Sequence, residues 1–365
     1  MQTMRIVILT VLFGIASSSW AAPPRLIGSS PLGVRRGETV EVAFEGVGLH
    51  ERPRLIAPFP FQLEEANDGE PMESRWAVRL TVDTGAAVGV YPIRVVTESG
   101  PSNPLLFAVG QLQQVAEVEP NNSPAAAQTI PYPAVVEGTC PGNDRDYYRF
   151  EGRQGDRVVV DALAARIGTE VDPTIRLSNA KGRLIASADD TPGLVTDAYF
   201  AAVLPEDGTY ILEFCDSRFA AEGRTGYRLT VGPVPFAAEV HPFAAPRGQN
   251  VAFELRGGTL SVDGLVALRT PSDPLLSMFH PAVPAKQIGD PAWAESDLDV
   301  EFPAPVPLGE STAIVVEPAA AGEGLAPLAS PATVLGRLSN PGEKDEYTIS
   351  APPGSRHEVR VEAWG

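Results

Sequence analysis

The chain has 365 residues, of which 46 are acidic and 28 are basic, so its formal net charge at pH 7 is -18. This charge disfavours nucleic acid and anionic membrane surfaces as partners, because both repel an acidic protein. The 36 prolines and 34 glycines exclude a largely helical chain, since both residues interrupt helices and mark turns between short strands. The length predicts two to four domains.

The N-terminus has the pattern of an export signal. Arg5 supplies a positive charge, an apolar run extends from Ile6 to Ala16, and small residues flank Trp20. The apolar run is shorter than the roughly 20 residues of a membrane-spanning helix. We therefore expect residues 1–21 to be a cleaved signal peptide, and the mature protein to be secreted, periplasmic or at the cell surface with no membrane partner. An uncleaved N-terminal anchor is the alternative.

The segment after this signal is repeated later in the chain. At a constant offset of 211, Ser30-Pro31-Leu32 and Arg36-Gly37 align on His241-Pro242-Phe243 and Arg247-Gly248. In the first copy Val40, Val42 and Phe44 alternate with small or acidic residues, which is typical of a half-buried strand. The repeat predicts two Ig-like domains, over residues 22–111 and 234–317.

A second repeat follows each of these segments. Pro133-Ala134 aligns on Pro331-Ala332 at an offset of 198, and Asp146-Tyr147 on Glu346-Tyr347 at 200. Alternating patterns predict further strands in the first copy, at residues 157–162, 174–177, 210–214 and 227–231. We expect a β-sandwich over residues 112–233 and an incomplete second copy over 318–365. The incomplete copy suggests that the chain is a fragment of a longer protein or the product of a truncated reading frame.

Three separated motifs carry a resemblance to a known family. They are Glu117 to Asn122, Gly142 to Phe150 and Asp207-Gly208-Thr209-Tyr210. Together they resemble the bacterial pre-peptidase C-terminal domain, a jelly-roll-like β-sandwich appended to secreted peptidases and other exported proteins. The segment from Pro24 to Gly110 is similar, less specifically, to the TIG group of Ig-like domains. The resemblance implies an all-β chain of tandem antiparallel β-sandwiches, with Ig-like domains alternating with jelly-roll-like ones, in an accessory role.

Acidic and amide side chains in two of these motifs predict a calcium site. Calcium takes six to eight oxygen ligands, and the first motif offers Glu117, Glu119, Asn121 and Asn122. Three of these side chains point to one side if the segment is extended, and Asp144 and Asp146 share a face of the following strand. The resemblance places the calcium of this family at the same two motifs, although Asn122 stands where Asp is common. A solvated linker and a polar turn are the alternative.

The second copy is predicted to be free of metal. At the offset of 198, Glu117 aligns on Val315, while Asn121-Asn122 align on Ala319-Ala320, so one site per chain is expected. Glu119 aligns on Glu317, Asp146 corresponds to Glu346, and Asp144 falls near Lys344. Asp189-Asp190 is interpreted as a polar turn. Cys140 and Cys215 allow either a disulfide or two buried thiols.

The sequence carries none of the local signatures of hydrolase or nucleotide chemistry. Gly-x-Ser-x-Gly, His-Glu-x-x-His and phosphate-binding glycine loops do not occur, and the four histidines lie in no catalytic motif. We therefore expect no enzyme within these residues. The predicted function is a non-catalytic accessory or adhesive protein that binds matrix, polysaccharide or another protein. The alternative is the accessory portion of a larger exported peptidase or other hydrolase whose catalytic domain lies outside the chain.

Overall fold

A computed structural model describes residues 22–66, 71–273, 276, 278–302, 305–309, 314–316, 327–329, 333–336, 342, 344–359 and 361. Within these residues the regular structure is strands β1 to β29 and three short 3-10 turns, which confirms the predicted all-β class. No helix of the described residues has the length and apolar character that crossing a bilayer requires. The predicted signal peptide lies outside the described residues.

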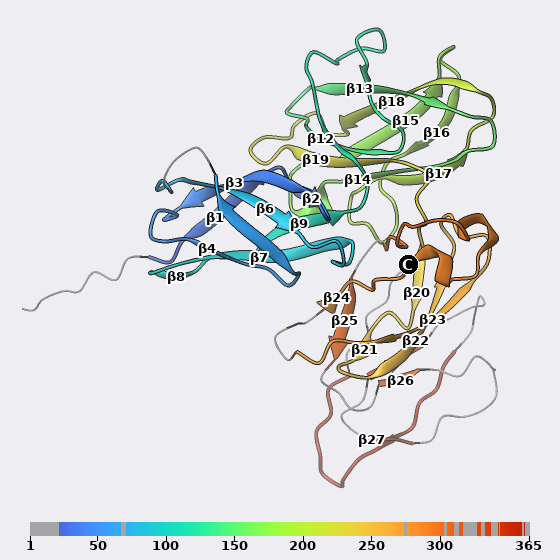
Figure 1. Ribbon diagram of the computed structural model, residues 1–365. Coiled ribbons are helices and arrows are strands. Elements are labelled where there is room, and N and C mark those ends of the chain that lie inside the picture. Colours follow the sequence, from blue (N-terminus) through green and yellow to red (C-terminus); the bar gives the residue numbers. More distant parts are fainter. Residues whose placement is uncertain are drawn as a thin grey trace, which may run out of the picture.

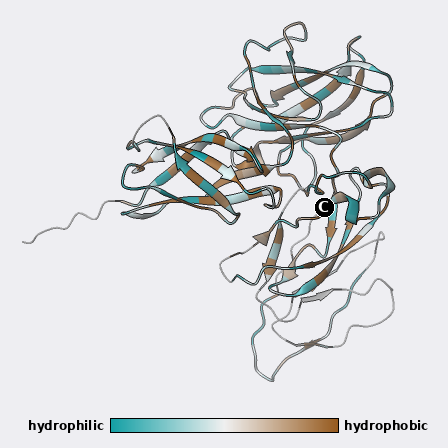
Figure 2. Cartoon of the chain, in the orientation of Figure 1, coloured by the Kyte–Doolittle hydropathy of each residue, from teal (hydrophilic) through white to brown (hydrophobic). Residues whose placement is uncertain are grey.

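The first sandwich consists of two facing sheets (Figure 1). One sheet has the order β1 (Arg25–Ser30), β3 (Thr39–Val47), β6 (Arg75–Val82), β5 (Phe61–Glu65). The other has the order β2 (Gly33–Arg35), β9 (Leu105–Gly110), β7 (Gly89–Thr97), β4 (Arg54–Ile56), with β8 (Gly100–Pro101) paired to β7. The alternation predicted for β3 is confirmed, because Val42 and Phe44 are fully buried and Phe44 stacks on Trp76 at 5.5 Å. Figure 2 shows the resulting alternation of polar and apolar residues along the strands.

The second sandwich has two five-stranded sheets. The first has the order β10 (Gln114–Ala116), β12 (Ala134–Thr139), β19 (Gly226–Gly232), β14 (Arg157–Leu163), β17 (Tyr199–Val203). The second has the order β11 (Gln128–Thr129), β13 (Arg145–Gly152), β18 (Gly208–Asp216), β15 (Pro173–Asn179), β16 (Leu184–Ala188). A 3-10 turn, η1 (Ala165–Ile167), follows β14. The strands predicted here are confirmed, but β10 and β11 pair in parallel with β12 and β13, because the chain crosses between the sheets before it returns.

A third unit packs around its own core, which includes Phe253, Leu255 and Trp293. Its sheets have the orders β20 (Glu239–His241), β22 (Asn250–Arg256), β23 (Gly264–Arg269) and β21 (Ala245–Pro246), β25 (Val306–Gly309), β24 (Met278–Phe279). Two 3-10 turns, η2 (Ala285–Gln287) and η3 (Pro291–Trp293), lie between β24 and β25.

Four short strands near the end of the chain show that the offset of 198, which aligned Glu117 on Val315, is wrong for this segment of the second copy. They are β26 (Ile314–Val316), β27 (Leu328–Ala329), β28 (Thr333–Leu335) and β29 (Ile349–Ser350). β26 and β28 pair in parallel as β10 and β12 do, with Val315 opposite Val334 where Val115 is opposite Val136. Glu117 therefore corresponds to Glu317 and not to Val315, because the segment between the paired strands is two residues shorter in the second copy. Glu317 itself lies outside the described residues.

A buried ion pair of the second sandwich lies against the first sandwich. Arg228 on β19 contacts Glu137 on β12, and the two side chains are 5% and 12% exposed. The backbone N–H of Leu32 donates to Glu137 Oε2 at 3.1 Å. Gly33 permits this approach, because a Cβ there would lie 2.7 Å from Arg228 Nη1. The first sandwich is thus attached to charged groups of the second.

We expect Glu137→Ala to destabilise the protein by about 3–5 kcal/mol, because it leaves Arg228 buried without its anionic partner. Differential scanning calorimetry would measure the loss. The matched control is Glu64→Ala, which breaks the exposed 3.6 Å pair with Arg79 and costs about 1 kcal/mol or less. Equal losses for the two variants would contradict the role of the buried pair.

Candidate metal centre

The predicted ligand segment, residues 117–122, crosses from one sheet of the second sandwich to the other. It leaves β10 where Glu117 N donates to the carbonyl of Glu137 on β12 at 2.8 Å. Tyr147 N on β13 donates to the carbonyl of Asn121 at 3.1 Å. Because backbone hydrogen bonds hold the segment at both sheets, its side chains face the start of β13.

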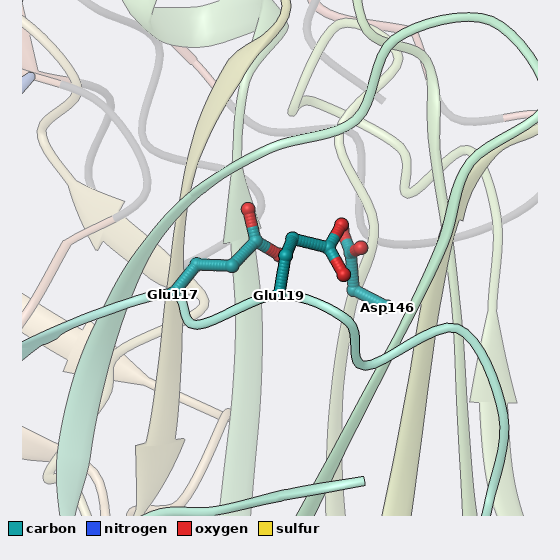
Figure 3. A group of neighbouring side chains, drawn as sticks. All are labelled: Glu117, Glu119 and Asp146. Atoms are coloured by element: carbon teal, nitrogen blue, oxygen red, sulfur yellow. The ribbon is translucent and has the colours of Figure 1, made fainter. Parts of the chain in front are cut away.

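Three carboxylates meet at this crossing. Oxygen atoms of Glu117, Glu119 and Asp146 all lie within 4.8 Å of one another (Figure 3). Asp146 is fully buried, because even-numbered residues of β13 face the core. Burial and then the negative charge of Glu117 raise the pKa of Asp146 well above its usual range. Like charges at this separation repel, so the group favours a proton or a cation.

Asn121 completes the inner group and leaves one oxygen unpaired. Its side chain is fully buried, and its Nδ2 donates to Glu117 Oε1 at 3.1 Å. Its backbone N–H donates to Glu119 Oε2 at 2.7 Å. Asn121 Oδ1 and Asp146 Oδ1 are both buried with no hydrogen-bond donor among the described residues. An unpaired buried polar atom costs about 1–3 kcal/mol, so these two oxygens, one of them on a carboxylate of the group, are an unfavourable feature that calls for an explanation.

Asn122 and Asp144 lie at the rim of the group and bond to each other. Asn122 Nδ2 donates to Asp144 Oδ1 at 2.9 Å, and Asn122 Oδ1 accepts from the backbone of Asn121 at 3.1 Å. Asp144 precedes β13 and lies in its entry turn, so its position differs from the strand position expected from the sequence. The structure therefore brings four of the six predicted residues together and places the other two beside them.

Two tyrosines that the sequence analysis missed form the floor of the group. Tyr148 OH donates to Glu117 Oε1 at 2.8 Å, and Tyr227 OH donates to Asp146 Oδ2 at 2.7 Å. The two hydroxyls also contact each other. Gly138 makes room for Tyr227, because a Cβ there would lie 2.5 Å from the hydroxyl oxygen. Tyr148 was detectable, since it follows Asp146 by two residues on one strand face, whereas Tyr227 comes from β19 and had no local signal.

A second acidic group lies at the end of the same sandwich. Carboxylate oxygens of Asp172, Asp189 and Asp190 are within 4.8 Å of one another. Arg218 Nε already lies 3.4 Å from Asp172 Oδ2, and Thr174 Oγ1 donates to Asp189 at 3.2 Å. The chain's own guanidinium therefore partly neutralises this group.

The two cysteines are buried free thiols, which is one of the two predicted alternatives. Cys140 packs in the core, with Sγ 3.5 Å from the carbonyl of Asp144. Cys215 occupies the odd-numbered face of β18 with Glu213, opposite Arg145 on β13. The two thiols are not bonded to each other, and burial raises the pKa of both.

Among known proteins, this chain is similar only to solved structures. No family model matches the chain, and no curated protein matches it. The pre-peptidase C-terminal domain of a collagenase from Bacillus anthracis is 20% identical, with 32% of this chain and 99% of that chain covered and a TM-score of 0.24. The periplasmic g-type lysozyme inhibitor PliG of Aeromonas hydrophila is 16% identical, with coverages of 33% and 95% and a TM-score of 0.22. The glucan-locus protein SGBP-B of Bacteroides ovatus is 11% identical, with coverages of 55% and 73% and a TM-score of 0.19.

We expect Tyr227→Phe to destabilise the second sandwich by about 1–3 kcal/mol, because Asp146 Oδ2 then loses its buried donor. Denaturant unfolding would measure the change. Tyr132→Phe is the matched control, since the Tyr132 hydroxyl is buried with no partner among the described residues and its removal should cost little. A Tyr227→Phe protein as stable as the control would show that the hydroxyl does not support the carboxylates.

Proposed function

We propose that this chain is an exported, non-catalytic binding protein whose second sandwich holds one calcium ion. The observation that carries the proposal is the pair of buried oxygens without donors, Asn121 Oδ1 and Asp146 Oδ1, in a group where the Asp146 carboxylate also faces those of Glu117 and Glu119. A cation at this point would satisfy both oxygens and offset the repulsion between the carboxylates. The motifs shared with the pre-peptidase C-terminal domain support the same assignment.

The residues present fit calcium better than other common metals. Glu117, Glu119, Asn121 and Asp146 offer only oxygen atoms, which hard cations prefer, whereas zinc prefers nitrogen and sulfur. Cys140 is close to Asp146, but its thiol contacts the carbonyl of Asp144 instead. In the proposed site these four side chains would hold the ion. Asn122 and Asp144 would support the rim of the site through the hydrogen bond between them.

The bound ion would act by fixing the crossing between the two sheets. Residues 117–122 belong to no strand. An ion bound by Glu117, Glu119 and Asn121 of this segment and by Asp146 of β13 would therefore tie the segment to β13. A rigid sandwich suits a protein that binds an extracellular polymer or protein through its surface. The export signal and the missing catalytic motifs support this accessory role. Polysaccharide, matrix and protein partners all fit the proposal.

We expect calcium at about 100 times its dissociation constant to stabilise the second sandwich by about 2.7 kcal/mol, because the ion binds only the folded state. Asp146→Asn should abolish this response. In chelator the same variant should melt higher than wild type, because it removes a buried carboxylate that faces Glu117. Thermal melts with chelator and with millimolar calcium measure both effects.

The control for this experiment is Asp189→Asn, which alters the second acidic group and should keep the full calcium response. A melting temperature of the wild type that is the same in chelator and in calcium would refute the calcium site. Loss of the response in Asp189→Asn, with Asp146→Asn unaffected, would assign the ion to the other acidic group.

Calorimetric titration should give one calcium ion per chain. By the strand register, the second copy has Ala319 in place of Glu119 and Ala321 in place of Asn121, and Lys344 in place of Asp144. Apolar side chains supply no oxygen, and an ammonium group repels the ion. Glu317→Gln and Glu346→Gln should both leave the stoichiometry at one. Two comparable sites, one of them lost in either variant, would refute the prediction for this copy.

A further inference from the structure

One sheet of the second sandwich is covered by the other two units. Leu163, at the end of β14, clusters with Leu32 and Ala108 of the first sandwich. Tyr199 on β17 stacks on Phe236 of the third unit, with ring centroids 4.3 Å apart. The other sheet, β11-β13-β18-β15-β16, lies on the side of the sandwich that is turned away from both units (Figure 1). An external ligand of the second sandwich therefore has this sheet available.

The uncovered sheet has a gap at its β11 edge. β11 pairs with β13 over two residues and ends at Thr129. Ile130 N then donates to the carbonyl of Arg149 at 3.0 Å, and the chain crosses to the opposite sheet. β13 continues to Gly152, and on this last stretch it is paired with β18 alone. The edge of β13 beyond Arg149 thus has no neighbouring strand among the described residues.

Glu151 has an open strand edge at this gap. Because the carbonyl of Arg149 points to β11, Arg149 and Ile211 are a non-hydrogen-bonded pair of β13 and β18. Bonded and non-bonded pairs alternate along antiparallel strands, so Glu151, opposite Thr209, also turns its backbone N–H and C=O away from β18. The described residues provide no backbone partner for either group. One main-chain donor and one acceptor are therefore available at the gap.

A pocket of about 390 Å³ lies at this gap, within the range of roughly 300–1,000 Å³ that is usual for small-ligand sites. Tyr132 lines it and stacks on Phe150, with ring centroids 4.8 Å apart and planes 5° from parallel. Phe150 in turn stacks on Tyr210 of β18 at 5.8 Å. The pocket thus has an aromatic wall that core packing fixes in place.

The polar lining of the pocket combines an anion, a cation and hydroxyl groups. Glu151 Oε1 accepts from Thr209 Oγ1 at 2.6 Å, and no described residue bonds to its Oε2. Arg149 Nε donates to the carbonyl of Ala127 at 2.8 Å, which orients the guanidinium and leaves Nη1 without a partner among the described residues. Thr129 adds a second hydroxyl. Since Arg149 and Glu151 have opposite charges, this lining is neutral in sum.

We propose that this pocket binds one neutral sugar unit of an extracellular polysaccharide, an inference that rests on the binding function proposed above. A sugar hydroxyl both donates and accepts, as the alternating donors and acceptors of Glu151 and Arg149 require. The apolar C–H face of a sugar ring packs on an aromatic side chain such as Tyr132. A charged sugar gains less, because it would be attracted by one of the two charges and repelled by the other.

An extended peptide fits the same gap less well. A peptide that adds to a sheet edge pairs with successive open positions along the strand. Here the next edge position after Glu151 is already used, because Arg153 N donates to Asp156 Oδ2 at 2.9 Å. A single open position suits a compact ligand with several hydroxyls.

Isothermal titration calorimetry of the full chain in calcium tests the pocket with neutral hexasaccharides of glucose, xylose and mannose. At least one should bind, at one site per chain. Glu151→Ala should weaken this binding about tenfold or more, because a hydrogen bond to a charged group is lost. Thr129→Trp should abolish measurable binding, because the indole fills the pocket while every polar group except the Thr129 hydroxyl remains.

The matched control is Glu213→Ala. Glu213 lies on the same outer face of β18, pairs with Arg145 at 2.5 Å and is not part of the pocket lining. This variant should bind the sugar with the affinity of the wild type. Near-ultraviolet circular dichroism should show that all three variants are folded.

A wild-type chain that binds none of the neutral hexasaccharides would overturn the proposal. Tighter binding of a hexagalacturonate, or of an alternating Thr-Val hexapeptide, would overturn it as well. So would unchanged sugar affinity in both Glu151→Ala and Thr129→Trp, since the sugar would then bind elsewhere. The rise of the melting temperature in calcium tests the proposed calcium site separately. A failed sugar titration with an intact calcium response therefore rejects the pocket alone.

Discussion

Residues 117–122 run from one sheet of the second sandwich to the other, and the oxygens they carry constrain that whole sandwich. The crossing cannot move outward, because Glu117 and Asn121 are bound to different sheets. It cannot be neutralised from within, because the described residues around it offer tyrosine hydroxyls and an amide but no cationic side chain. The core beneath it, with Tyr148 and Tyr227, is arranged around these oxygens rather than around apolar contacts alone.

Other buried carboxylates of the second sandwich have donors from the chain itself. Arg166 contacts both Asp161 and Asp197, and Arg228 contacts Glu137, whereas Asp216 accepts backbone N–H groups. A guanidinium satisfies a carboxylate with donors in fixed geometry. Among the described residues no guanidinium pairs with Asp146, and its Oδ1 has no hydrogen-bond partner. The acidic group at the crossing therefore differs from the paired carboxylates of the same sandwich.

The alternation of apolar and polar residues was sufficient to predict the all-β class. It also predicted the strands in which buried and exposed residues alternate clearly, such as β3 and β18. It also brought out Glu117, Glu119, Asn121 and Asp146, because local spacing sets which residues of an extended segment share a side. Asp144 was misplaced because strand boundaries depend on pairing rather than on composition. Tyr227 and the register of Val315 both depend on partners far away in sequence, which no local pattern contains.

Tyr227 has a consequence for the order of events during synthesis. Its hydroxyl holds Asp146, yet it lies 81 residues further along the chain, on the strand between β12 and β14. During synthesis, a chain whose β19 has not yet left the ribosome already contains the acidic motif. It still lacks the Tyr227 hydroxyl that orients Asp146. The oxygen group is therefore assembled only when the last strand of the sandwich closes the sheet. Ion capture at this crossing would therefore report that the domain is complete.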